Sequence, residues 1–188
     1  MPCGPDPNLQ AARDSYYQGA EGAKDGFSRA EKLFGRLWAE CPRDPVIQVY
    51  VGSLKLASAS HTWALWKRNS LSREGMQLMN DAVSKSPSDL EIRFVRAVTT
   101  YNLPFFFHVR DQSRADFAFL ASRVEPAARA SVLPSFLAAA ALYFHAEFLQ
   151  DDGKTSDAVR FWQRAIALAP QSRAARDSQA ELKRLHEH

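Results

Sequence analysis

The stretch that decides the fold is LYFHAEFLQDDGKTSDAVRFWQRAIALAP, residues 142–170. Two helical patterns lie on either side of the turn residues 151–153, which read Asp-Asp-Gly. In the second pattern, four residues stand at offsets 0, 4, 7 and 12, namely Ala158, Trp162, Ala165 and Pro170. The alanines let a partner helix come close, the indole fills the space between the helices, and the proline ends the second helix. We therefore expect a helix-turn-helix unit in which Trp162 is buried against Ala146 and Leu142.

This spacing resembles that of a tetratricopeptide (TPR) repeat, a helix-turn-helix unit that stacks into a solenoid. Ala30, Phe34 and Pro42 repeat the offsets 0, 4 and 12 near the start of the chain. Helix-breaking prolines recur at intervals of roughly 40 to 45 residues, at Pro42, Pro87, Pro126 and Pro170. The resemblance implies an all-α fold, a TPR-like right-handed α-solenoid of about four degenerate helix pairs plus a C-terminal capping helix at 171–187. We expect residues 1–6 to be a flexible tail and residues 7–188 to form a single helical-repeat domain.

Composition indicates an ordinary globular chain. The 188 residues are 46% hydrophobic, and 24 basic against 21 acidic side chains give a net charge of +3. That balance is too mild to indicate nucleic-acid binding. The two cysteines, Cys3 and Cys41, exclude a disulfide framework and a four-cysteine zinc site, and a single disulfide is the less favoured alternative.

The N-terminal sequence MPCGPDPNLQ has neither the basic nor the apolar region of a secretory signal. We therefore expect a cytoplasmic protein; the alternative is the bacterial cell envelope or periplasm, if a signal peptide has been removed. The most apolar window, residues 132–149, is interrupted by Pro134, His145 and Glu147. It predicts a buried helix and no transmembrane segment.

Local signals place several helix ends. Asp44 before Pro45 predicts a helix start, and Ser88 with Glu91 forms a capping box in which Glu91 reaches back to the Ser88 amide. Residues 61–86 predict a helix, with a break near 69–70. Trp63 and Trp66 belong to its apolar face, so we expect them in the core. The alternative is that they form a stacking wall beside the basic residues that follow.

Residues 50–107 resemble a group of small bacterial TPR-like proteins without an assigned biochemical role. The segments that carry this resemblance are Tyr50 to Ser53, Trp66-Lys67, Glu74-Gly75, Arg93 to Arg96 and Leu103 to Phe106. Members of that group often carry a signal peptide, and the resemblance implies no catalytic residues.

A binding groove is predicted around two arginines. Arg93 and Arg96 lie three residues apart and share one helix face, while the apolar residues of that segment point elsewhere. Guanidinium groups in a groove would bind an acidic peptide or a C-terminal carboxylate through paired hydrogen bonds. The residues that could complete this groove are Lys67, Arg68, Arg110, His108 and Trp66. The alternative, preferred for each arginine taken alone, is a pair with a neighbouring carboxylate: Asp89, Glu91, Asp111 or Asp116.

Catalytic and metal-binding motifs are not found. The sequence has no HExxH, GxSxG, GxxxxGK[ST] or GxGxxG, and His145-Ala-Glu147 lacks the P-C-x-x-C of zinc deaminases. We therefore expect no metal, no cofactor and no enzymatic activity. The interpretation we prefer is a protein–protein interaction module, an adaptor or scaffold that binds a peptide or partner helix in a concave groove. Two alternatives are a self-assembling structural subunit, which would be a homo-oligomer, and a small-ligand or enzymatic site around Arg93, Arg96 and His108.

Overall fold

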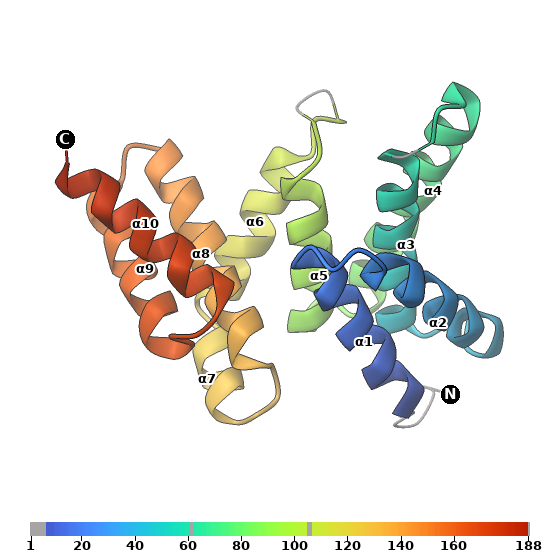
Figure 1. Ribbon diagram of the computed structural model, residues 1–188, viewed down its shortest axis with the longest axis horizontal. Helices are drawn as coiled ribbons and strands as arrows, with labels where there is room; N and C mark the ends of the chain where they lie inside the picture. The colour runs from blue at the N-terminus through green and yellow to red at the C-terminus, as the bar shows by residue number, and fades with distance from the viewer. Residues whose placement is uncertain (1–6, 61, 105–106, 188) are drawn as a thin grey trace. The chain divides into compact units, whose positions relative to one another are not determined.

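The computed structural model describes residues 7–60, 62–104 and 107–187, and within them the chain is all-helical with no strand. The expected all-α class is confirmed, whereas the predicted tail at residues 1–6 lies outside the described residues. The helices, drawn in Figure 1, are α1 (Pro7–Ala20), α2 (Gly26–Glu40), α3 (Pro45–Ser60), α4 (Leu65–Lys85), α5 (Leu90–Tyr101), α6 (Arg110–Ala121), α7 (Val124–Arg129), α8 (Ser135–Asp151), α9 (Thr155–Leu168) and α10 (Arg173–His186).

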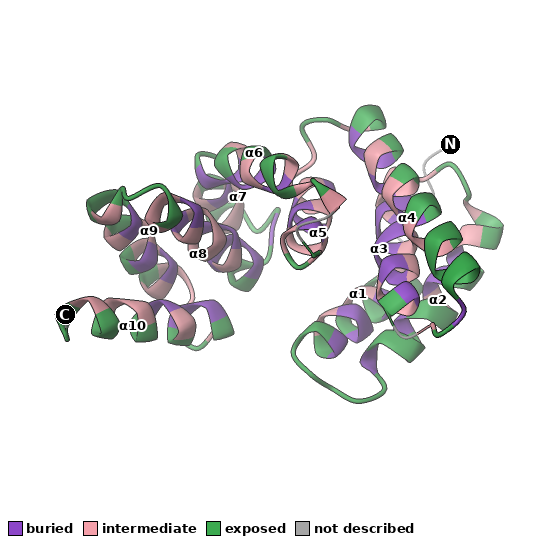
Figure 2. Ribbon diagram, turned by 90° about the horizontal axis from the view of Figure 1, so that it is seen from above, coloured by how far each residue is buried: buried purple, intermediate pink, exposed green. Residues whose placement is uncertain are grey.

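The chain divides into two compact units, residues 1–99 and 100–188, with the boundary near the end of α5. Each unit has its own buried residues (Figure 2) and is described by itself. The single domain and the right-handed solenoid expected from the sequence stay predictions.

The first unit is built from two helical hairpins, α1 with α2 and α3 with α4, and α2 also packs against α3. Helices α3 and α4 approach each other at Gly52 and Gly75. A Cβ atom placed on Gly52 would lie 2.7 Å from the Gly75 carbonyl oxygen, and one placed on Gly75 would lie 2.6 Å from the Gly52 carbonyl oxygen. Any larger residue would force the two backbones apart, so the hairpin depends on both glycines.

In this unit, aspartate side chains cap helix starts, and prolines follow helix ends. Helices α2 and α4 end at Glu40 and Lys85, shortly before Pro42 and Pro87, as predicted. The start at Asp44 is also confirmed, because its Oδ1 accepts the Val46 amide at 2.9 Å.

The predicted capping box at the start of α5 is wrong. Asp89 takes the capping position, because its Oδ1 accepts the Ile92 amide at 3.0 Å. Glu91 turns away from the helix end and accepts two hydrogen bonds from Arg13, at 2.5 and 2.6 Å. An ion pair with the guanidinium is a stronger partner for a carboxylate than a backbone amide, so the long-range contact prevails over the local one.

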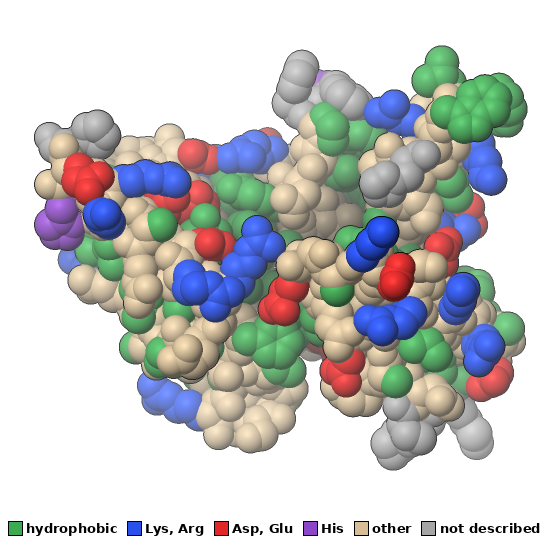
Figure 3. Space-filling model, viewed as in Figure 1, with side chains coloured by type: hydrophobic (Ala, Val, Ile, Leu, Met, Phe, Trp, Pro, Cys, Tyr) green, Lys and Arg blue, Asp and Glu red, His purple; other side chains and the backbone are tan. Residues whose placement is uncertain are grey.

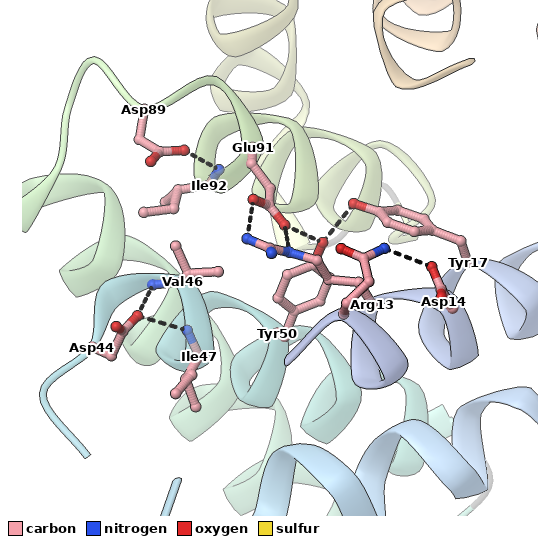
Figure 4. A network of polar contacts seen from close by, with 11 residues as sticks. Arg13, Asp14, Tyr17, Asp44, Val46, Ile47, Tyr50, Asp89, Glu91 and Ile92 are labelled. Atoms are coloured by element: carbon pink, nitrogen blue, oxygen red, sulfur yellow. Dashed lines mark hydrogen bonds and ion pairs between the residues drawn. The ribbon is translucent and has the colours of Figure 1, made fainter. Parts of the chain in front are cut away.

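A polar network ties α1 to α3 and α5 in the first unit (Figure 4). The Tyr50 hydroxyl donates to Glu91 at 2.7 Å, so the Tyr17 hydroxyl, 2.5 Å from that of Tyr50, donates to Tyr50. Burial raises the pKa of Tyr50 well above its usual value, which keeps the phenol protonated as a donor. Nearby, the hydroxyl groups of Ser53 and Tyr16 share a hydrogen bond, with their oxygens 2.7 Å apart. The network therefore ties α1 to a residue of α5 that lies 78 positions later in the sequence.

The second unit is organised around the hairpin of α8 and α9. Gly153 stands in the turn with a φ of 74°, a conformation that favours glycine. Trp162 is 1% exposed and shares a buried cluster with Ala146 and Ala158, so the predicted burial of Trp162 against Ala146 is confirmed. Leu182 and Leu185 of α10 pack against the same cluster, as a capping helix would.

One predicted break takes a different form. Helix α6 ends at Ala121, three residues earlier than expected, and Pro126 lies in the first turn of α7. Proline is tolerated there because the first amides of a helix have no intrahelical acceptor. The chain therefore turns before Pro126.

Two further features bear on the expectations from sequence. Cys41 is disulfide-bonded, whereas the sequence analysis disfavoured a disulfide. No helix in the described part of the chain is long and apolar enough to cross a membrane.

Candidate functional site

The first unit contains a groove of about 250 Å³ between α2, α3 and α4. Its apolar lining comes from all three helices: Phe34, Trp38, Val51, Leu54 and Leu78. Phe34 is fully buried and Leu54 is 4% exposed, so these two side chains form a floor that is continuous with the core. A groove of this kind can take an apolar side chain from outside and exclude water from it.

Gly35 keeps one side of the groove open. It lies on α2 among the lining residues, and a Cβ atom placed on it would have no neighbour within 4 Å. Glycine inside a helix costs roughly 0.5–1 kcal/mol relative to alanine, and packing against α3 does not require it here. The space above α2 is therefore free to receive a ligand atom.

The rim of the groove carries charge. Lys55 Nζ lies 3.1 Å from Glu74 Oε1, with exposed side-chain fractions of 29% and 54%. Glu31 also lines the groove and accepts a hydrogen bond from the Ser58 hydroxyl at 3.4 Å. Two carboxylates against one ammonium leave a net negative rim around an apolar floor.

The two arginines predicted to form a peptide site are half-buried on α5 of the first unit. Arg93 Nε donates to the Pro87 carbonyl oxygen at 2.5 Å, and Arg96 Nη1 donates to Asn80 Oδ1 at 3.1 Å. Both guanidinium groups thus hydrogen-bond within the unit. None of the carboxylates suggested by the sequence appears in these two bonds.

The other predicted site residues are distributed along the chain. Trp66, Lys67 and Arg68 are exposed at the start of α4 in the first unit. His108 and Arg110 belong to the second unit, where His108 is exposed with a φ of 54°. The structure therefore brings together Trp66 with Lys67 and Arg68, and Arg93 with Arg96.

Arg110 has an established set of contacts in the second unit. Its Nη2 lies 2.5 Å from Asp151 Oδ2, and its guanidinium lies over the rings of Tyr101 and Phe148, at 5.4 and 5.0 Å from their centroids. An ion pair with cation–π contacts on two rings indicates a structural role for Arg110.

The expectation that Trp63 and Trp66 lie in the core is wrong. Their exposed fractions are 88% and 74%, and their rings meet edge to face with centroids 6.3 Å apart. Helix α4 begins at Leu65, later than predicted, and it shows no break at residues 69–70. Trp63 consequently precedes the helix, outside the face that Met79 and Ala82 bury.

The half-buried carboxyl group of Glu147, on α8, lies beside Trp162 in the second unit. The pKa of Glu147 is raised to about 7, mainly by burial and also by the nearby carboxylates of Glu181 and Asp151, while Trp162 and Arg184 act to lower it. The Trp162 indole nitrogen has no hydrogen-bond partner among the described residues, yet it lies close enough to the carboxyl group to lower that pKa. Burial also lowers the pKa of His145, so this imidazole stays neutral.

Metal chemistry finds no support in this arrangement. No three residues among His, Cys, Asp and Glu cluster in the described part of the chain in a way that could hold a metal ion.

Sequence reasoning missed the groove, whose signals were Gly35 in a helix interior and the carboxylates that flank it. It also missed the Glu147 site, although Glu147 stands out in an apolar window.

Comparison with models of protein families, with characterised proteins and with solved structures finds no match to this chain.

Proposed function

We propose that the chain is a non-catalytic protein-interaction module whose groove between α2, α3 and α4 binds one apolar side chain of a partner helix or peptide. The observation that carries the proposal is the apolar floor of Phe34 and Leu54 beneath an open side at Gly35. A volume of about 250 Å³ accommodates a single large aliphatic or aromatic anchor rather than a drug-sized molecule. Binding sites between proteins concentrate their affinity in such anchors.

The rim selects the charge of the partner. Glu31 and Glu74 outnumber Lys55, and Lys55 is already paired with Glu74. A partner with lysine or arginine next to its apolar anchor would gain attraction from these carboxylates, whereas an acidic partner would be repelled. The acidic peptide expected at Arg93 and Arg96 stays a prediction, since both guanidiniums already donate to neighbouring oxygens.

The decisive variant fills the groove without disturbing the core. Gly35→Leu adds a side chain where a Cβ atom meets open space, and it replaces glycine by a better helix former. The variant should therefore be at least as stable as the wild type and still lose binding. Gly35→Ala is the matched control, because a methyl group leaves most of the groove open.

The experiment selects peptides from a random displayed library on the wild-type protein and then measures their affinity for each variant. We expect peptides with an apolar anchor beside lysine or arginine, bound at least tenfold more weakly by Gly35→Leu and nearly as well by Gly35→Ala. Arg93→Gln/Arg96→Gln should bind these peptides unchanged. Selection of acidic peptides that depend on the two arginines, or equal affinity for Gly35→Leu, would refute the groove.

A further inference from the structure

The first turns of α4 are exposed on every side. Residues 65–70 all lie at the surface. Trp63, two residues before the helix begins, is exposed as well. A helix usually buries one apolar face against a neighbour. This one instead presents large apolar side chains to solvent.

The exposed apolar side chains of this tip are Trp63, Leu65 and Trp66, with exposed fractions of 88%, 68% and 74%. They follow one another within four residues, just before α4 and in its first turn. Exposed hydrophobic side chains gather at the upper right of Figure 3, on the side where Figure 1 draws α4. Contiguous exposed aromatics of this kind mark a binding surface. Because these side chains project and do not line a hollow, they are suited to insertion into a fluid interface.

The charge around the tip is uniformly basic. Between Asp44 and Glu74 the sequence contains no carboxylate, while Lys67, Arg68 and Arg73 follow the two tryptophans. Lys67 and Arg68 are exposed and have no ion-pair partner among the described residues. Arg73 follows Trp66 by seven residues and so lies on the same helix face two turns further along.

The helix end adds a third attraction for anions. Ala64 occupies the capping position of α4 and, within the described residues, no side chain caps the first amides. Arg68 donates the first backbone hydrogen bond of the helix, to the Ala64 carbonyl oxygen at 2.9 Å. The amides of the turn before it therefore point outward from the positive end of the helix dipole.

We propose that this tip, Trp63 to Arg68, docks on an anionic phospholipid surface. Tryptophan is enriched at the boundary between headgroups and acyl chains, where its ring is half-solvated, and Leu65 would enter the acyl region beside it. Lys67, Arg68 and the uncapped amides would meet lipid phosphates. Exposure all round the helix favours a fluid interface over a protein groove, which would cover one side only. The assignment goes beyond the peptide groove and does not depend on it.

Co-sedimentation with vesicles tests the proposal, using phosphatidylcholine alone or mixed with phosphatidylglycerol. The wild-type chain should bind the anionic vesicles, with a blue shift of tryptophan fluorescence, and should bind neutral vesicles much more weakly. Each basic residue near an anionic surface contributes roughly fivefold to the partition coefficient, so Lys67→Gln/Arg68→Gln should lower it about 25-fold. Trp63→Ser/Trp66→Ser should abolish the fluorescence shift and reduce binding at least tenfold.

Matched variants keep the test specific. Lys32→Gln/Arg36→Gln removes two exposed basic residues of α2. Val132→Ser removes an apolar side chain of the second unit that is 76% exposed. Both should bind anionic vesicles like the wild type. Absence of wild-type binding, or equal losses in the matched variants, would overturn the proposal. Binding to oligothymidylate without binding to vesicles would also overturn it, and would identify the tip as a nucleic-acid surface.

Discussion

Gly52 and Gly75 face each other across the α3–α4 contact so closely that each leaves no room for a Cβ atom on the other. The contact holds together the hairpin that carries both the groove and the tryptophan tip.

Gly75→Ala should destabilise the first unit by about 1–3 kcal/mol, because the added methyl group meets the Gly52 carbonyl oxygen and the two helices must separate. The gain in helix propensity offsets part of this cost. Urea unfolding measures the difference, with Gly35→Ala as the control that should gain stability in open space. Equal stability of Gly75→Ala and the wild type would show that the helices do not approach this closely.

Trp162→Ala should cost about 3–5 kcal/mol, since it removes a fully buried ring and leaves a cavity between α8 and α9. Trp63→Ala is the matched control, and it should change stability by less than about 0.5 kcal/mol. Thermal unfolding of both variants makes the comparison. Similar costs for the two would contradict the burial of one ring and the exposure of the other.

Glu147 should make stability depend on pH. Its pKa in the folded protein is about 7, above its ordinary value of 4.5, so the folded state holds the proton more tightly than the unfolded state. The stability that this proton contributes is fully present below pH 4.5 and is lost as the pH rises to 7. Glu147→Gln should therefore match the wild type in acid and exceed it at pH 8, by about 1 kcal/mol after allowance for partial exposure.

The control for this pH series is Glu125→Gln. The hydrogen bond from Arg164 lowers the pKa of Glu125, so its contribution is present at neutral pH and is lost as the pH falls through the folded pKa. The two variants should consequently shift stability at neutral pH in opposite directions. Unfolding midpoints measured from pH 4 to pH 8 show this directly. If Glu147→Gln is less stable than the wild type at every pH in this range, the carboxyl group is ionised in the folded protein.

The Arg13–Glu91 pair should couple α1 to α5. The pair is largely shielded, with exposed fractions of 26% and 18%, and Tyr50 also donates to the carboxylate. Arg13→Met leaves that carboxylate without its cation and should cost about 2–3 kcal/mol. A double-mutant cycle with Glu91→Gln should give a coupling energy of about 1–3 kcal/mol. The Arg160–Asp157 pair, with exposed fractions of 74% and 51%, should give less than about 1 kcal/mol when treated in the same way.

Local sequence signals predicted what depends on neighbours in the chain. Pro42, Pro87 and Pro170 follow helix ends because proline cannot donate the backbone hydrogen bond that would continue a helix. Trp162 is buried because small residues one turn away leave a space that only a large ring fills. These features follow from spacing alone, so they could be predicted without knowledge of the distant chain.

Features that depend on distant residues could not be predicted in this way. Glu91 has a plausible local acceptor role at its helix end, and nothing nearby in sequence shows that Arg13 offers a stronger partner. The apolar spacing of Trp63 and Trp66 fits a core face equally well. Trp63 is exposed because it precedes α4, and Trp66 because the whole first turn of α4 lies at the surface. The groove requires three helices to meet, so no single segment contains its signature.

The reach of the Arg13–Glu91 pair has a consequence for synthesis on the ribosome. The two residues are 78 positions apart, which corresponds to a delay of roughly 4 to 16 s at 5–20 residues per second. During that interval the nascent α1 carries a guanidinium without its carboxylate and a tyrosine cluster without its acceptor. The contacts that tie α1 to Glu91 therefore cannot form until α5 has been synthesised, so they belong to a late step in the assembly of the first unit.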